Sequence, residues 1–363
     1  MALTTFTMAK LRAVLFGATG LAGQQFVSAL RAHPWFELAA LAASPRNAGR
    51  RYAEALAEGG WFLPEPIPAA LASLPLLEPS AVEAGDFDLA FSAVEAEVAR
   101  ELEPRAARLI PVFSTASAFR YEADVPLLLP PVNGAHLALV RAQGARGFRG
   151  YVAPIANCTA TGLAVCLAPL VERFGVKAVL MTSLQAVSGA GRSPGVGALD
   201  VLDNVIPFIA KEEAKVEAET RKVLGRWAPG QSEVEPHPMR ISATCTRVAV
   251  LEGHTETVSV SLERPAPLDE VRAAMRDWRG DTTARDLPST PPRWIEVLDA
   301  VDRPQPRLDR ETHGGMATSV GRLREDAVLP NGVKFVLVTH NTKLGAARGA
   351  VLVAELAKSQ GFL

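Results

Sequence analysis

A glycine-rich turn between two apolar segments constrains the fold of this chain more than any other feature. Residues 12–16 (RAVLF) have the length and composition of a short buried strand, and residues 24–34 (QQFVSALRAHP) show helical spacing up to Pro34. Between them, residues 17–23 (GATGLAG) repeat glycine at every third position. A strand that enters a helix through such a turn is the start of a βαβ unit. The chain is therefore predicted to begin with a parallel α/β sheet.

Further apolar runs extend this sheet. Strands are predicted over residues 36–44, 87–94, 108–115 and 125–133, with helical or loop segments between them. Alternating strands and helices indicate a doubly wound, Rossmann-type parallel sheet. Because 363 residues exceed what one hydrophobic core usually serves, two domains are expected. We assign the first to residues 1–155.

The pattern changes near Tyr151. Alternating polar and apolar residues over 177–191, 239–253 and 254–265 predict an α+β domain with a mostly antiparallel or mixed sheet. Proline and charged residues over 277–310 predict a loop with one short strand or helix. We expect this second domain to span residues 156–340, and residues 341–363 to form a helix that returns to the first domain.

Charge and cysteine content exclude several classes of protein. The chain carries 38 Lys and Arg against 39 Asp and Glu, a net charge of −1 with no basic block, which argues against a nucleic-acid partner. Three cysteines cannot all pair and match no zinc-binding spacing, so we expect reduced thiols, no metal and a cytoplasmic location. No signal peptide or run of about 18 apolar residues is found, so no membrane association is expected.

The glycine-rich turn predicts a dinucleotide cofactor. Glycine lets the backbone approach a pyrophosphate, and the N-terminus of the following helix attracts its charge. NAD-specific sites generally place an acidic residue after the second strand, but residues 36–44 lead into PRNAGRR without a carboxylate. Ser44 and Arg46, with Arg50 or Arg51 as further candidates, suit a 2′-phosphate, which favours NADP. The alternatives are a turn without a ligand and a solvated basic loop.

Cys158 is the candidate nucleophile. It lies at the start of a helical apolar run in residues 154–166 (PIANCTATGLAVC), where the first backbone N–H groups of a helix lack partners. That position lowers the pKa of a thiol and suits covalent catalysis. A structural cysteine, which we expect of Cys166, is the alternative.

A base and charged groups accompany it elsewhere in the sequence. His254 follows Gly253 at the turn between two alternating strands, where a side chain can project into a cleft. Arg247 lies among apolar neighbours and needs an anion, which is either a protein carboxylate or a substrate carboxylate. Glu212 and Lys215 are three residues apart and share one side of a predicted helix.

With these residues assembled, the chain resembles the aspartate-β-semialdehyde dehydrogenase family nearly end to end, in the branch with a double-Glu helical signature. The likeness is carried by residues 14–27, 113–133, 157–163, 184–196, 202–225, 245–256, 302–310 and 339–350. Their order along the chain makes the likeness far more specific than one glycine-rich turn. The resemblance implies that the second domain is the catalytic and dimerisation domain.

The resemblance also implies roles for individual residues. Cys158 would be the acyl-accepting nucleophile, and His254 the acid/base. Arg247 would hold the substrate α-carboxylate, Gln185 would orient the acyl group and Glu212 would bind the amino group. The other implied substrate-binding residues are Arg120 and Lys215, for the phosphate, and Asn157. The implied NADP-binding residues are Gly17, Thr19, Gly20, Leu21, Ala22, Ser44, Arg46, Ser92, Ser188, Gly189 and Asn341.

The implied reaction reduces L-aspartyl 4-phosphate with NADPH to the semialdehyde and phosphate, for lysine, threonine and methionine synthesis, in a homodimer or homotetramer. Three departures from the family pattern leave the substrate open. The chain has PIANCT where NPNCS is usual, CTRV where CNRV is usual, and Pro131 where Glu is common. A malonyl-CoA or succinyl-CoA reductase with the same Cys and His chemistry is the nearest alternative, and a catalytically silent NADP-binding protein is the other.

Overall fold

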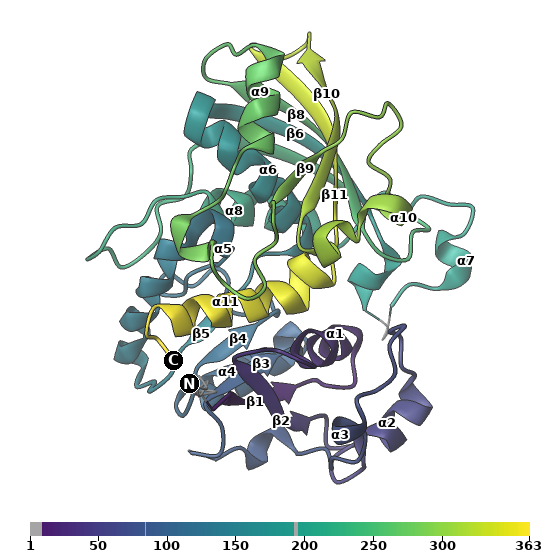
Figure 1. Ribbon diagram of the computed structural model, residues 1–363, viewed down its shortest axis with the longest axis vertical. Coiled ribbons are helices and arrows are strands. Elements are labelled where there is room, and N and C mark those ends of the chain that lie inside the picture. Colours follow the sequence, from purple (N-terminus) through teal and green to yellow (C-terminus); the bar gives the residue numbers. More distant parts are fainter. Residues whose placement is uncertain (1–8, 84, 192–194) are drawn as a thin grey trace, which may run out of the picture.

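The computed structural model describes residues 9–83, 85–191 and 195–363 (Figure 1). Its first half contains a five-stranded parallel sheet in the order β2-β1-β3-β4-β5. The strands are β1 (Leu11–Phe16), β2 (Phe36–Ala42), β3 (Leu89–Ser92), β4 (Val112–Ser114) and β5 (Val152–Pro154). The order reverses between β1 and β3, which is the arrangement that opens a ligand crevice at the carboxyl ends of the strands. The predicted Rossmann-type sheet is confirmed.

Helices and loops connect these strands. They include α1 (Leu21–Leu30), α2 (Tyr52–Gly59), α3 (Ala69–Ala72), η1 (Pro79–Ala81), α4 (Ala96–Ala107), α5 (Pro130–Asn133) and η2 (Gly134–Arg146). Helix α1 starts directly after Gly20 and ends before Pro34, close to the predicted bounds. The glycine spacing has a steric cause, since a Cβ on Gly23 would lie 2.2 Å from the carbonyl oxygen of Gly17.

The strand predicted over residues 125–133 is wrong. Only Leu128 forms an isolated bridge there, to Ile155, and residues 130–133 are the short helix α5. Prolines 126, 130 and 131 lack the N–H groups that a ladder needs. The fifth strand is instead β5, whose three residues are too few to give a periodic signal.

The second half contains a six-stranded mixed sheet in the order β7-β6-β8-β11-β10-β9. Its strands are β6 (Val176–Gln185), β7 (Arg240–Arg247), β8 (His254–Leu262), β9 (Ile295–Val297), β10 (Thr318–Asp326) and β11 (Gly332–Thr339). β6–β7 and β9–β10 are parallel, and β6–β8, β8–β11 and β10–β11 are antiparallel. The predicted mixed sheet is confirmed.

The helices of this half are α6 (Cys158–Phe174), η3 (Val187–Ala190), α7 (Ala198–Val201), α8 (Glu212–Val223), α9 (Leu268–Arg276), η4 (Thr282–Ala284), α10 (Pro306–Asp309), η5 (Thr312–Gly315), the π-helical turn η6 (Lys343–Ala347) and α11 (Arg348–Ser359). Of these, α6, α8 and α9 pack against the sheet and each other, whereas α7 stands away from the sheet (Figure 1). Residues 277–310 contain more structure than predicted, with η4, β9 and α10. Short elements between prolines leave no periodic pattern in the sequence.

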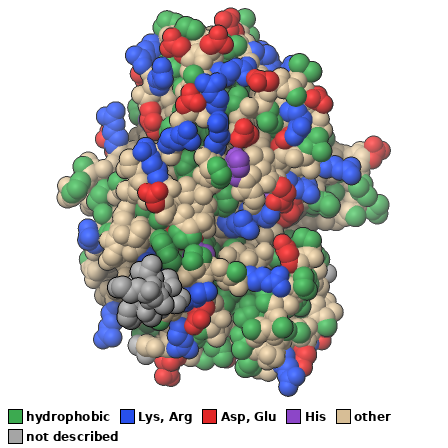
Figure 2. Space-filling model, viewed as in Figure 1, with side chains coloured by type: hydrophobic (Ala, Val, Ile, Leu, Met, Phe, Trp, Pro, Cys, Tyr) green, Lys and Arg blue, Asp and Glu red, His purple; other side chains and the backbone are tan. Residues whose placement is uncertain are grey.

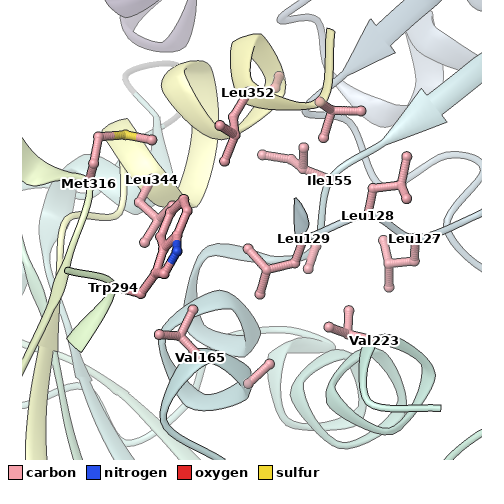
Figure 3. Packing of buried hydrophobic residues seen from close by; sticks show 14 of the residues in the cluster. Leu127, Leu128, Leu129, Ile155, Val165, Val223, Trp294, Met316, Leu344 and Leu352 are labelled. Atoms are coloured by element: carbon pink, nitrogen blue, oxygen red, sulfur yellow. The ribbon is translucent and has the colours of Figure 1, made fainter. Parts of the chain in front are cut away.

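Helix α11 connects the two halves. It packs against α1 and β4 of the first half, and Glu355 lies 2.8 Å from His33 at the end of α1. Figure 3 shows the core beneath it, where Leu352 of α11, Val165 of α6 and Ile155 after β5 surround one apolar volume. Because the hydrophobic cluster is continuous, the division at residues 155 and 340 stays a prediction.

The surface carries both signs of charge. Lys and Arg side chains are interspersed with Asp and Glu over the face shown in Figure 2. Within the described part of the chain, no helix combines the length and apolar character needed to cross a membrane. The same residues contain no group of three or more His, Cys, Asp or Glu side chains placed to hold a metal ion.

Candidate active site

Cys158 is the first residue of α6, and Asn157 caps this helix. The Asn157 side-chain oxygen accepts hydrogen bonds from the N–H groups of Thr159 at 2.8 Å and Ala160 at 3.2 Å. The cap satisfies two of the donors that every helix N-terminus leaves free. It thereby fixes the first turn of α6, which presents the half-buried Cys158 side chain to a cleft.

Strand directions bring the other candidate side chains to the same place. Gln185 and Arg247 are the last residues of the parallel strands β6 and β7, and they are paired in register. His254 is the first residue of β8, which runs antiparallel to β6 and therefore starts at the edge where β6 ends. Residues far apart in sequence are thus collected at one edge of the second sheet.

Cys158 and His254 form the central pair. The Cys158 sulfur lies 3.2 Å from Nε2 of His254, and the backbone N–H of Ala186 donates to Nδ1 of the same ring at 3.1 Å. Because Nδ1 accepts this hydrogen bond, the neutral imidazole carries its proton on Nε2. The ring therefore presents an N–H donor to the sulfur and to any oxygen bound beside it.

The electrostatics of this pair differ from the sequence prediction. Burial, and secondarily the Glu212 carboxylate, raises the pKa of Cys158 to about 12, although Arg120 and Arg247 act in the opposite direction. Burial also lowers the pKa of His254 to about 3, with Arg247 contributing. The prediction of a lowered thiol pKa is therefore wrong for the protein without ligands. Desolvation outweighs the helix N-terminus, and both groups rest in their neutral forms.

Arg247 is the cation of the site. Its side chain is buried and donates to the carbonyl oxygen of Ala186 at 2.7 Å. No carboxylate in residues 9–83, 85–191 or 195–363 lies within 4.0 Å of the guanidinium. A Cβ on Gly189 would lie 3.0 Å from Nη1 of Arg247 and 3.2 Å from Nε2 of His254. A buried guanidinium without a protein carboxylate is suited to an anionic ligand.

Glu212, the first residue of α8, gathers polar groups around Asn157. One carboxylate oxygen accepts from Nδ2 of Asn157 at 2.8 Å and Nε2 of Gln185 at 3.3 Å. The other lies 3.6 Å from Nζ of Lys215, whose side chain is 28% exposed. The structure therefore brings Gln185 and Lys215 together at Glu212, which also bonds to Asn157, the residue before Cys158. Their roles toward a substrate stay predictions.

Arg120 is already paired inside the protein. One guanidinium nitrogen donates to both oxygens of Glu219 at 3.2 Å, and another donates to the carbonyl of Thr115 at 2.8 Å. Glu219 is fully buried and also accepts the backbone N–H of Asn157 at 2.6 Å. Glu219 is not among the residues predicted from sequence, although its spacing of seven residues from Glu212 places both on the same side of a helix.

A cleft of about 720 Å³ extends from Arg46 to Cys158. The predicted cofactor residues that line it are Thr19, Gly20, Leu21, Ala22, Arg46, Ser188, Gly189 and Asn341. Gly17, Ser44 and Ser92 are not among its lining residues, and their contacts with the cofactor stay predictions. Gly17 shapes the turn with a φ of 77°, Ser44 is exposed to solvent and Ser92 is buried in the sheet.

One end of the cleft is polar. Arg46 is 83% exposed there, and its guanidinium lies 3.9 Å from Glu58 of α2. Arg50 instead pairs with Glu58 at 2.8 Å, so its charge is already neutralised. Glu58 also lines the cleft, but it lies in α2, beyond the end of the second strand where NAD-specific sites place their carboxylate. Arg46 therefore remains the better candidate for a ligand phosphate.

Two family models match most of the chain. The model described as semialdehyde dehydrogenase, NAD binding domain, matches residues 12–140, and that described as semialdehyde dehydrogenase, dimerisation domain, matches residues 167–344. The aspartate-semialdehyde dehydrogenase of Methanothermobacter thermautotrophicus is 43% identical over 94% of this chain and 97% of its own. The chain belongs to the aspartate-semialdehyde dehydrogenase family.

Other members of the aspartate-semialdehyde dehydrogenase family agree in sequence and structure. The Saccharomyces cerevisiae enzyme is 40% identical, over 96% of this chain and 98% of its own. A crystal structure of the Candida albicans enzyme with NADP superposes with a TM-score of 0.87 at 38% identity, over 98% of this chain and 100% of that one. A second, from Vibrio cholerae, reaches a TM-score of 0.75 at 25% identity.

The departures from the aspartate-semialdehyde dehydrogenase pattern occupy structural positions. Thr246 donates its hydroxyl to the carbonyl of Ser183 at 2.7 Å, and Thr159 is fully buried behind the helix cap. Pro131 is buried in α5, and its carbonyl accepts the N–H of Asp281. None of the three lines the cleft. The choice of substrate stays a prediction, because Gln185, Glu212 and Arg247 do not line this cleft either.

Proposed function

We propose that this chain reduces L-aspartyl 4-phosphate to L-aspartate 4-semialdehyde with NADPH, a step toward lysine, threonine and methionine. The observation that carries the proposal is the Cys158–His254 pair at 3.2 Å, at the end of a cleft, beside a buried Arg247 that lacks a protein carboxylate. A thiol, an imidazole donor and an unpaired cation are what acyl transfer from an α-amino acid requires. The family relatives support the same reaction.

NADP fits the cleft. The Gly17–Gly23 turn leads into the N-terminus of α1, where backbone N–H groups can hold a pyrophosphate, and Arg46 is placed for the 2′-phosphate. Ser188 and Asn341, joined by a hydrogen bond of 2.8 Å, line the end near Cys158 and are proposed to hold the nicotinamide. The bound nicotinamide would supply a hydride to the acyl carbon.

The chain's own residues account for the rest of the chemistry. The sulfur of Cys158 attacks the acyl carbon, the C–S bond forms as the C–O bond to phosphate breaks, and the thiol proton leaves with phosphate. His254, with its proton on Nε2, then donates a hydrogen bond to the oxygen anion of the thiohemiacetal. When that anion collapses, the C–S bond breaks, the aldehyde is released and the electron pair of the bond stays on the sulfur as a thiolate. A proton from solvent then restores the thiol. In this tautomer His254 acts first as a donor, and its base role belongs to the reverse reaction.

The substrate groups have candidate partners. Arg247 is proposed to hold the α-carboxylate and Glu212 the amino group, with Gln185 orienting the acyl oxygen. Lys215 is the better phosphate ligand, because it is partly exposed and its pairing with Glu212 spans 3.6 Å. Arg120, also proposed for phosphate, would have to reach the ligand while held by Glu219. Asn157 is proposed to act through the α6 cap and Glu212.

A substrate panel tests the proposal. Oxidation of aspartate semialdehyde should require phosphate or arsenate. The absorbance of the NADPH formed measures the rate, with the concentrations of phosphate and coenzyme A varied independently. Lys215→Ala should raise the KM for phosphate and lower kcat/KM by about ten- to a hundredfold, because a charged hydrogen bond is lost. Arg247→Ala should weaken the amino-acid substrate instead. Turnover of malonyl-CoA or succinyl-CoA without phosphate, and none of the semialdehyde, would establish an acyl-CoA reductase.

We also propose a homodimer or a homotetramer built from it. The family model that matches residues 167–344 is a dimerisation domain, and Leu180 of β6 is 48% exposed on the sheet. Four exposed apolar side chains follow nearby in sequence, at Leu199, Leu202, Val205 and Phe208. Light scattering should give a dimer or tetramer mass that falls for Leu180→Asp, with exposed Leu308→Asp as the control. A monomer at micromolar concentration would contradict the proposal.

A cytoplasmic location is part of the same proposal. The three cysteines are unpaired in the structure, which suits a reducing compartment. Cell fractionation should recover the protein with the cytosolic enzymes.

A further inference from the structure

A buried histidine outside the reacting groups connects two turns of the active site. His340 follows β11 directly and is fully buried. Its Nε2 lies 3.1 Å from a carboxylate oxygen of Glu311, before η5, and 3.7 Å from one of Glu252, in the turn between β7 and β8. Two carboxylates from different segments therefore converge on one ring.

The same carboxylates hold the residues that follow His340. The hydroxyl of Thr342 donates to Glu252 at 2.8 Å and lies 3.4 Å from Nδ1 of His340. Lys343 pairs with the second oxygen of Glu311. The ring of His340 and the side chains of Thr342 and Lys343 thus connect residues 340–343 to the segments that carry Glu252 and Glu311.

Residues 340–343 also contact the segments that carry His254 and Ser188. Asn341 accepts the backbone N–H of Gly253, the residue before His254, at 2.8 Å, and it donates to Ser188 at 2.8 Å. The N–H of Gly345 donates to the carbonyl of His340 at 3.1 Å.

Gly345 in turn packs on the nucleophile. A Cβ on Gly345 would lie 2.8 Å from Cβ of Cys158, so the turn forms one wall around that side chain. His340 also contributes electrostatically to the lowered pKa of His254, after burial and Arg247. His340 itself is absent from the residues that line the cleft.

We propose that His340, held between Glu311 and Glu252, is a positioning residue that keeps Cys158, His254 and Asn341 in one reactive geometry. The inference rests on the proposed function for the role of Cys158. His340 is not a catalytic residue, because it reaches the nucleophile through Gly345 and the imidazole through Asn341 and Gly253. Small displacements of reacting groups are costly, so loosening this segment should affect turnover more than folding.

The test compares His340→Asn with His313→Asn. His313 forms a similar pair with Glu296 at 3.1 Å but is partly exposed at the surface, which makes it a matched control. His340→Asn should lower kcat by about ten- to a hundredfold, with KM for aspartate semialdehyde nearly unchanged. Iodoacetamide should meanwhile alkylate Cys158 roughly fivefold faster in the free protein, because the Gly345 wall loosens. His313→Asn should change neither quantity.

Several outcomes would overturn the proposal. They are a kcat of His340→Asn within about twofold of the parent, an unchanged alkylation rate, or equal losses in His313→Asn. If His340→Asn does not fold, Glu311→Gln removes one carboxylate charge at a side chain that is 54% exposed, and it should give the same two changes at smaller size. No change there would also overturn it. Alkylation of Cys158 needs neither substrate nor cofactor. If the unmodified protein does not turn over aspartate semialdehyde, that result contradicts the proposed function, and the alkylation rates still test the role of His340.

Discussion

At the scale of single residues, Cys158 shows how far its surroundings outweigh its position in sequence. The helix N-terminus favours a thiolate, but burial and Glu212 raise the pKa of the thiol to about 12. Cys166 and Cys245 are fully buried, and burial raises their pKa values as well. What distinguishes Cys158 is access, because it alone among the three lines the cleft.

Alkylation tests this distinction. Brief iodoacetamide treatment near neutral pH should label Cys158 before Cys166 and Cys245, as peptide mapping would show. Glu212→Gln should lower the pKa of Cys158 and speed its labelling, because a nearby negative charge that opposes the thiolate is removed. Glu217→Gln, on the same helix, should leave the rate unchanged. Equal labelling of all three thiols, or full activity of Cys158→Ala, would exclude Cys158 as the nucleophile.

Cofactor choice also depends on one side chain. NADPH should bind more tightly than NADH, and Arg46→Ala should reduce that preference by roughly tenfold or more, since a charge-assisted contact is lost. Arg51→Ala is the control, because Arg51 is exposed and does not line the cleft. Titration of cofactor fluorescence would measure both affinities. Equal binding of the two cofactors by the parent protein would refute this interpretation of Arg46.

At the scale of elements, the β1–α1 turn separates structural glycines from a cofactor-facing one. A Cβ on Gly23 would lie 2.2 Å from the carbonyl of Gly17, whereas one on Gly20 would meet the same atom at 3.6 Å, an ordinary contact. Gly23→Ala should therefore displace α1, lower the melting temperature and abolish NADPH binding. Gly20→Ala should keep the melting temperature and weaken only NADPH. Thermal unfolding and cofactor titration distinguish the two, and identical effects would contradict the steric argument.

Helix α8 shows why its charged pattern was hard to interpret from sequence. Glu212 and Glu219 point inward to Asn157 and Arg120, while Glu213 and Glu217 accept backbone N–H groups of Cys245 and Ala243 on the edge strand β7. A run of charges at helical spacing usually indicates a solvated face. Here tertiary contacts give each of these four carboxylates a partner, and they also protect a sheet edge.

At the scale of the whole molecule, burial makes stability depend on pH through Glu103. This carboxyl group of α4 bonds to Ser114 of β4, and burial raises its pKa to about 7. The folded state therefore holds the proton more tightly than the unfolded state. The resulting stabilisation is complete below the unfolded pKa of about 4.5 and is lost as pH rises through about 7.

Glu103→Gln should remove this dependence. The amide oxygen can still accept from Ser114, but the side chain no longer has to ionise in the core at high pH. Urea unfolding should show the variant more stable than the parent at pH 8, with a smaller difference at pH 5.5. Glu101→Gln, an exposed position on the same helix, is the control. A parent and variant with the same pH profile would show that Glu103 does not titrate in this range.

The sequence by itself determined the features that depend on local spacing. Glycines at 17, 20 and 23 predict a tight strand-to-helix turn, alternating polar and apolar residues predict half-buried strands, and the apolar run with helical spacing predicts a helix that starts near Cys158. The family likeness, carried by short motifs in order, was also available from sequence. The three-residue strand β5 and the short elements over 277–310 were not, because they are too short to show a period.

Only the tertiary structure decided the relations that depend on distance and burial. The pairing of Cys158 with His254, 96 residues apart, depends on the packing of α6 against the sheet that carries β8. Both members of that pair are neutral because they are desolvated, and desolvation cannot be predicted from their positions in the sequence. Whether Arg120 is free or paired, and whether His340 supports the nucleophile, depended on which side chains long-range packing placed beside them.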